Sequence, residues 1–283
     1  MASRTNVAVL APVAVLAPVA TLPMYDWPEI RAATDALWQA VRNAAARRGL
    51  DLPATLDRSR RPFDLWTDPA LTLGQTCGLP FVTRLRGKVR LLATPCYAAA
   101  GCDGPLYSSM IVVARNSRYR RLEDLRGARA AYNAVHSQSG YAALRAALAP
   151  LADGRPFFGK TIETGTHRNS LRALASGDAD ICTVDAVCWA LATRHDAAIT
   201  SRLRLIGQTP MTPGLPLVCA ASRTDGEVAA IRAALAEAIT EGLDPATRSA
   251  LMLDGLEVLP EYDYDAIGAM GEAADAFGYK ILH

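Results

Sequence analysis

The chain has 283 residues, of which 51% are hydrophobic and 20% are charged, and this balance excludes an intrinsically disordered protein. Its 30 Lys and Arg residues nearly match its 28 Asp and Glu residues, and the resulting net charge of +2 argues against a protein that binds nucleic acid or a membrane surface. Aromatic residues make up 6% of the chain, too few for a base-stacking surface. At roughly 150 residues per domain, the length corresponds to about two domains.

The N-terminal region carries the hexapeptide VAVLAP twice, at residues 7–12 and 13–18. An arginine followed by this apolar run could form an export signal. Prolines argue against cleavage by a signal peptidase. A cut after Ala17 would make Pro18 the first residue of the mature chain, which these enzymes reject, and a cut after Ala20 would put Pro18 at the third position before the cut, where a small residue is needed. The run is also too short and too rich in proline to span a membrane. We therefore expect an uncleaved, cytoplasmic protein without membrane insertion, with export as the alternative.

From residue 19 onward, short apolar runs alternate with amphipathic helices, a pattern typical of an α/β fold. Proline before a helix and glycine after it mark several boundaries. We expect strands at 19–22, 89–95, 107–114, 129–133, 161–164, 181–184, 203–206 and 217–220. We expect helices at 28–48, 122–125, 140–151, 170–176 and 189–195, then a mainly helical remainder with a new helix at Asp244 and Pro245. A connection at 58–66, a glycine-bounded turn at 71–80 and a loop at 97–105 complete this prediction.

The chain contains no composition typical of a flexible linker, so two domains would be joined by strands. We expect residues 1–105 and 216–283 to form a discontinuous lobe 1. Residues 106–215 would form an inserted lobe 2. This topology predicts a hinge and a cleft between the lobes.

A serine-rich turn, Ser137-Gln138-Ser139-Gly140, lies between a predicted strand and a predicted helix. Helix N-termini carry free N–H groups and a partial positive charge, and serine hydroxyls add donors for a phosphate-like oxyanion. The ordinary alternative is a serine that caps the helix without binding a ligand.

A second turn, with Thr166, His167 and Ser170, also runs from a strand into a helix. Because both turns follow strands of one predicted sheet, they should converge on one crevice, although a surface helix start is the alternative for His167. Asp185 follows the next strand, where its carboxylate would accept the hydrogen of a P–OH group or an amine and would reject a bare dianion. Its alternative role is that of N-cap for the helix that begins at Ala186.

Tyr25, Tyr107 and Gln75 are further candidates for ligand contacts, since they could supply phenol hydroxyls, an aromatic wall and an amide. Packing is the ordinary alternative for each.

Enzymatic motifs are missing from the sequence, which contains no G-x-S-x-G, H-E-x-x-H, G-x-x-x-x-G-K-[ST] or G-x-G-x-x-G. The six cysteines contain no C-x-x-C pair, so we expect neither a metal site nor a cofactor, and we expect buried thiols. Cys96 and Cys102 flank a short loop and form the one pair suited to a disulfide test.

Five segments together resemble the phosphate-, phosphite- and phosphonate-binding proteins of ABC transporters; they are residues 23–30, 101–109, 137–141, 164–170 and 177–185. The resemblance covers nearly the whole chain from about residue 19. It implies a two-lobed, type 2 periplasmic-binding-protein fold that closes on an oxyanion and performs no chemistry. It implies ligand contacts at Ser137, Ser139, Gly140, Thr166, His167 and Asp185, and less directly at Tyr25. Gln138 stands where the family often has threonine, and Thr166 where it often has serine.

The sequence thus favours a solute-binding protein for a phosphonate, phosphite or phosphate, acting with an ABC permease. A cytoplasmic sensor of the same fold is the alternative. An enzyme related to the pyrimidine-precursor synthases is the less favoured one.

Overall fold

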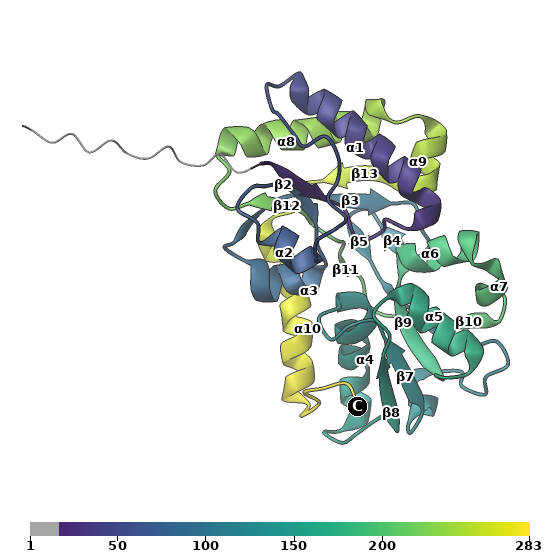
Figure 1. The fold of residues 1–283 in the computed structure, drawn as a ribbon. Coiled ribbons are helices and arrows are strands. Elements are labelled where there is room, and N and C mark those ends of the chain that lie inside the picture. The colour runs from purple at the N-terminus through teal and green to yellow at the C-terminus, as the bar shows by residue number, and fades with distance from the viewer. Residues whose placement is uncertain (1–16) are drawn as a thin grey trace, which may run out of the picture.

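The computed structural model describes residues 17–283, which form two five-stranded sheets, a small three-stranded sheet and the helices packed around them (Figure 1). The argument about export and the duplicated hexapeptide falls almost entirely on residues 1–16, outside the described part. No helix among residues 17–283 combines the length and the apolar character needed to cross a membrane.

The first sheet has the strand order β1-β2-β12-β3-β13 and therefore draws on both ends of the chain. β1 pairs with β2 in parallel, whereas β12 runs antiparallel to both β2 and β3, and β13 runs antiparallel to β3. The strands are β1 (Val19–Thr21), β2 (Leu71–Gln75), β3 (Val89–Tyr97), β12 (Leu217–Ala220) and β13 (Leu253–Glu257).

Helices cover both faces of the first sheet, so its central strands β2 and β12 are buried on two sides. On one face Trp38 of α1 (Arg31–Ala46) and Ile231 of α8 (Asp225–Glu237) share a core with Leu92. On the other face Trp66 and Tyr264 belong to a second core. The remaining elements around this sheet are η1 (Pro28–Ile30), α2 (Pro62–Trp66), α3 (Gly78–Pro80), η2 (Phe81–Leu85), η5 (Ala238–Gly242), α9 (Pro245–Leu251) and η6 (Glu261–Tyr264).

The second sheet has the order β10-β6-β9-β7-β8 and comes from the middle of the chain. Its central strand β9 lies antiparallel to β6 and parallel to β7, and β7 is also parallel to β8. Its strands are β6 (Ser109–Ala114), β7 (Arg129–Tyr132), β8 (Lys160–Glu163), β9 (Ile181–Asp185) and β10 (Leu203–Gln208). Its helices are η3 (Leu122–Leu125), η4 (Gln138–Ala142), α4 (Ala143–Ala152), α5 (His167–Ser176), α6 (Ala186–His195) and α7 (Ala197–Thr200).

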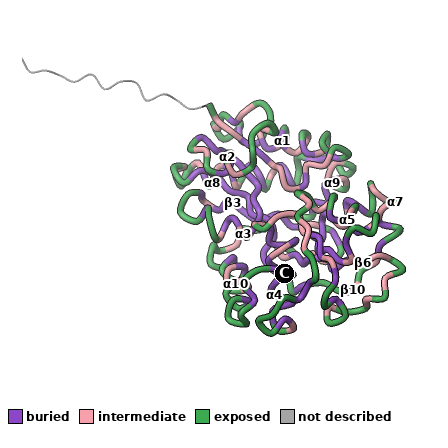
Figure 2. Tube along the Cα trace, turned by 60° about the horizontal axis from the view of Figure 1, so that its bottom comes forward, coloured by how far each residue is buried: buried purple, intermediate pink, exposed green. Residues whose placement is uncertain are grey.

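The chain crosses from the first large sheet to the second and back again at the small sheet. The small sheet consists of β4 (Cys102–Asp103), β5 (Leu106–Tyr107) and β11 (Thr212–Pro213). The C-terminal helix α10 (Asp265–Ala276) also contacts the elements around both large sheets. It follows η6 beside the first sheet and packs against α4 beside the second (Figure 1). The buried guanidinium of Arg145 on α4 holds this helix through Asp275 at 2.6 Å and through the carbonyl of Gly271 at 3.0 Å. Buried residues run through the strands at the centre of the molecule, and exposed residues lie at its periphery (Figure 2).

The α/β class and most predicted elements are confirmed, including the strand at 217–220 and the helix that Asp244 caps. Two predictions were wrong. The expected turn at 71–80 contains strand β2, all five residues of which are buried. The expected connection at 58–66 contains α2. The C-terminal remainder is mainly helical as predicted, and it also contains β13, an edge strand whose partner β3 lies far away in the sequence.

Candidate ligand-binding site

Three candidate segments lie at one edge of the second sheet, because they follow the C-terminal ends of its parallel strands β7, β8 and β9. Open α/β sheets bind ligands at this edge. The arrangement brings the serine turn, the His167 turn and Asp185 into one region.

The serine turn leads into α4 and is buried from Ser137 to Gly140. The Ser137 hydroxyl accepts a 3.0 Å hydrogen bond from the Gly140 N–H, so Ser137 is the helix cap. A side chain at Gly140 would collide with the amide oxygen of Asn133, which explains the need for glycine there. The Gln138 N–H points at the thiol of Cys77, at 3.3 Å.

The second turn meets the first through one side-chain contact. Ser139 Oγ and His167 Nε2 lie 2.9 Å apart, within hydrogen-bonding distance. Burial of the ring lowers the pKa of His167 to about 4, so the imidazole is neutral near pH 7. Thr166 is exposed and caps α5, and Ser170 bonds to the Thr164 hydroxyl at 2.7 Å, so neither hydroxyl is directed to the other candidates.

Asp185 combines the two roles that the sequence left open. Its Oδ1 accepts hydrogen bonds from the N–H groups of Val187 at 2.7 Å and Cys188 at 3.2 Å, and thereby caps α6. Its Oδ2 accepts a 2.7 Å hydrogen bond from the Tyr25 hydroxyl, which belongs to the other end of the chain. Burial raises the pKa of Asp185 to about 6, although these hydrogen bonds oppose the rise.

Side chains near the first sheet complete the region. The Gln75 amide donates to the Tyr97 hydroxyl at 3.0 Å, and the Tyr97 ring packs edge-on against Tyr25 with 5.1 Å between ring centroids. Cys77 and Tyr97 were missing from the sequence prediction. Each follows or ends a strand of the first sheet, which is the signal that could have found them.

Tyr107 is buried, and its hydroxyl has no hydrogen-bond partner among residues 17–283, although Ser139 lies next to it. Its neighbours Cys77 and Asp185 add to the effect of burial in raising the pKa of Tyr107, which keeps the phenol protonated. The Gln138 side-chain oxygen is a second buried atom without a partner in the same part of the structure. A buried unpaired polar group costs about 1–3 kcal/mol, so these two atoms mark a place where a polar ligand would be stabilising.

The candidate residues carry no fixed positive charge. Arg168 adjoins His167 in the sequence, but its guanidinium is paired with Asp196 at 2.6 Å and Glu29 at 2.7 Å and lies over the Trp27 ring. The side-chain donors available to a ligand are therefore neutral hydroxyls and an imidazole, while the N–H groups of Gln138 and Gly140 already donate to Cys77 and Ser137.

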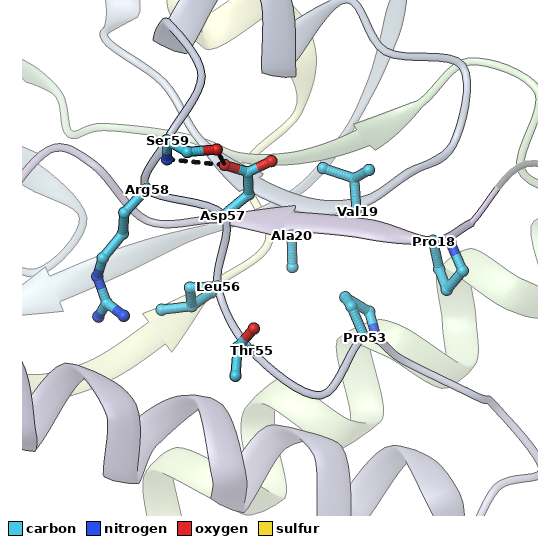
Figure 3. A pocket seen from close by; sticks show the side chains of 9 residues that line it. All are labelled: Pro18, Val19, Ala20, Pro53, Thr55, Leu56, Asp57, Arg58 and Ser59. Carbon is cyan, nitrogen blue, oxygen red and sulfur yellow. Dashed lines mark hydrogen bonds between the residues drawn. The ribbon is translucent and has the colours of Figure 1, made fainter.

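An open hollow of about 580 Å³ lies elsewhere, beside β1 at the edge of the first sheet (Figure 3). Its one carboxylate, that of Asp57, already accepts from the Ser59 N–H at 2.8 Å and from the Ser59 hydroxyl at 2.9 Å. None of the candidate residues lines this hollow, and we do not assign a site to it.

Among residues 17–283, no cluster of three or more His, Cys, Asp or Glu side chains could hold a metal ion. All six cysteines are free thiols, so Cys96 and Cys102 are not bonded to each other.

The two helix-covered sheets and the crossings between them define a periplasmic-binding-protein fold, as expected. Residues 70–264 match the family described as "ABC transporter, phosphonate, periplasmic substrate-binding protein", and the chain belongs to this family. The family consists of substrate-binding transport proteins, which confirms the expectation of binding without catalysis. Comparison with curated protein sequences gives no match.

Solved structures with the same fold are distant in sequence. The binding-protein component of a phosphonate ABC transporter from Pseudomonas aeruginosa has a TM-score of 0.72 and 14% identity, with 92% of this chain and 87% of that chain covered. PhnD1 from Prochlorococcus marinus, solved with methylphosphonate, has a TM-score of 0.68 and 16% identity, with 94% and 98% covered. XAC2383 from Xanthomonas citri, solved with ATP, has a TM-score of 0.68 and 14% identity, with 93% and 98% covered. At 14–16% sequence identity, the similarity to these three structures shows that the chain shares their fold.

Proposed function

We propose that this protein binds a small phosphorus oxyanion between its two large sheets, as the binding component of an uptake system with an ABC permease. The observation that carries the proposal is the Ser139–His167 contact, which joins two oxyanion-type turns beside the unpartnered hydroxyl of Tyr107. Family membership and the methylphosphonate complex of PhnD1 support the choice of a phosphorus compound.

Each group has a distinct part in this proposal. The hydroxyls of Ser139 and Tyr107 donate to anionic oxygens, and hydrogen bonds to a charged group are the stronger kind. His167 orients the Ser139 hydroxyl: in the tautomer with a proton on Nε2, the ring donates to Ser139 Oγ and leaves the hydroxyl hydrogen for the ligand. Asp185 accepts the proton of a P–OH group, which favours a ligand that retains one proton.

Ligand entry requires the two lobes to separate, because the candidate residues at the centre of the site are almost wholly buried. In the proposed division, residues 1–105 and 216–283 form one lobe and residues 106–215 the other. The contacts Tyr25–Asp185 and Cys77–Gln138 then cross the cleft. A ligand selects the closed state because only that state offers donors from both lobes.

Titration calorimetry of the full chain with methylphosphonate, phosphite, phosphate and sulfate tests the proposal. We expect binding of at least one phosphorus oxyanion and a loss of about 10-fold to 100-fold in affinity for Ser139→Ala, since a hydrogen bond to a charged group is removed. Ser201→Ala is the matched control, because Ser201 is an exposed serine outside this region. Equal affinities of Ser139→Ala and the unmodified chain would contradict the assignment.

A further inference from the structure

Arg168, the second residue of α5, pairs with two carboxylates through a single guanidinium group. Its Nε and Nη2 donate to Asp196 at 2.6 Å and 2.8 Å, and its Nη1 and Nη2 donate to Glu29 at 3.2 Å and 2.7 Å. These hydrogen bonds lower the pKa of both carboxyl groups, so both are ionised near pH 7. The rigid, planar fork of arginine suits this double pairing.

The indole ring of Trp27 covers the same guanidinium, with 4.7 Å between Arg168 Cζ and the ring centroid. Trp27 immediately precedes η1, which lies beside the first sheet, but its side chain packs against a core cluster of the second sheet that includes Leu171 and Leu174 of α5. The Arg168 side chain is 20% exposed, so its contacts are partly shielded from water and salt. Partial removal of water also strengthens the attraction between a cation and an indole ring.

The two carboxylates lie on different sides of the proposed cleft. In the proposed division, Asp196 belongs to the same lobe as Arg168, whereas Glu29 and Trp27 belong to the other lobe. The Asp196 pair can therefore persist when the lobes separate, and it keeps the guanidinium in position. The Glu29 pair requires closed lobes, and it forms at a smaller entropy cost because Arg168 is already held.

The segments joined by Arg168 also carry residues of the candidate site. The N–H of Trp27 donates to the Tyr25 carbonyl at 2.8 Å, and the Tyr25 hydroxyl bonds to Asp185. On the other side, Arg168 directly follows His167 in the chain. Contacts made by Arg168 thus hold two site-bearing segments against each other.

We propose that Arg168 is a positioning residue for ligand binding, which holds the lobes closed through Glu29 and Trp27 and thereby slows release of the ligand; the inference rests on the function proposed above. Arg168 acts without touching the ligand, because its donors are directed to the two carboxylates. A ligand enters while the lobes are apart, so an ion pair made only in the closed state should affect dissociation more than association.

Glu29→Gln tests the proposal, because it removes the charge and nearly keeps the shape of the side chain. Stopped-flow tryptophan fluorescence of the full chain measures both rate constants with methylphosphonate, or with phosphite or phosphate if calorimetry shows that only these bind. We expect the dissociation rate constant to rise about threefold to fivefold, with the association rate constant nearly unchanged. In an Arg168→Met background, Glu29→Gln should cause no further rise, since the two side chains act as a pair.

Asp180→Asn is the matched control. Asp180 accepts hydrogen bonds from Nε and Nη2 of Arg129 at 3.0 Å and 2.8 Å, and both residues belong to the second sheet's side of the molecule. Loss of this pair leaves the contacts between the lobes intact, so the dissociation rate constant should not change. Thermal melting checks that every variant folds.

The outcomes that overturn the inference are distinguishable. An unchanged dissociation rate constant in Glu29→Gln, or an equal rise in Asp180→Asn, rejects the positioning role and leaves the proposed function standing. An unmodified chain that binds none of methylphosphonate, phosphite and phosphate rejects both.

Discussion

Tyr25 donates a 2.7 Å hydrogen bond to Asp185, which lies 160 residues further along the chain. The contact joins the loop after β1 to the end of β9, so it connects the two large sheets at the candidate site. The same carboxylate caps α6 through its other oxygen, which fixes its position. A buried carboxylate held in this way is suited to share one proton with a ligand.

Replacement of this carboxylate should change how binding depends on pH. In the unmodified chain, a ligand that must keep one proton should lose about tenfold in affinity per pH unit above its own second pKa. In Asp185→Asn the amide can donate to a dianion, so the affinity for methylphosphonate should become nearly independent of pH. Calorimetry in buffers of different ionisation enthalpy measures the proton uptake directly, and an unchanged uptake in the variant would contradict the role of Asp185.

The stability of the ligand-free protein should also report on Asp185. Its pKa rises from 3.8 to about 6 on folding, so the folded state favours the neutral acid. This contribution is fully present below pH 3.8 and is lost as the pH rises through about 6, with a change of about 3 kcal/mol.

Asp185→Asn keeps an oxygen for the helix cap and cannot ionise. Its free energy of unfolding relative to the unmodified chain should therefore increase between pH 4 and pH 7. Urea denaturation at the two pH values measures this difference, and a constant difference would show that Asp185 ionisation does not oppose folding.

Replacement of the two serines of the serine turn by alanine should have different effects, one on stability and one on ligand affinity. Ser137 caps the helix, so Ser137→Ala should lower the free energy of unfolding by about 1 kcal/mol. Ser139 is paired with His167, and Ser139→Ala should mainly lower ligand affinity. Denaturation and calorimetry on both variants separate the two effects, and a reversed pattern would contradict the assignment.

Ser139 and His167 should also be energetically coupled in binding. If His167 acts by orienting the Ser139 hydroxyl, the double variant Ser139→Ala/His167→Ala should bind scarcely more weakly than either single variant. Such non-additivity is expected of side chains in direct contact. Fully additive losses would show that the two residues act independently.

Cys77 should report on opening of the cleft. It is buried, burial raises the pKa of its thiol, and it accepts a hydrogen bond from the N–H of Gln138 in η4, which belongs to the second sheet's side of the site. Labelling by a thiol reagent, followed by peptide mass spectrometry, should be slower with methylphosphonate present. Cys219 in β12 is the control, and equal slowing of both would indicate a general gain in stability rather than closure.

Local signals predicted much of the fold. Gly49 and Gly177 end their helices with φ values of +74° and +84°, as expected of glycine after a helix. The strands that were missed lack such signals. β2 is buried along its whole length and so shows no alternation, and β13 is partly exposed at a sheet edge.

The candidate site was predicted where the chain itself forms a motif, as in the two strand-to-helix turns. Cys77 and Tyr97 could not be predicted in the same way, because each is a single side chain that only the pairing of distant strands brings to the site. The sequence also could not decide between two roles for Asp185, since a carboxylate has two oxygens and the structure uses both.

A crystal structure of the full chain grown with methylphosphonate tests the central claim most directly. The account predicts phosphonate oxygens within hydrogen-bonding distance of the Ser139 and Tyr107 hydroxyls. Methylphosphonate bound instead in the hollow beside β1, with Ser139 and Tyr107 untouched, would contradict it.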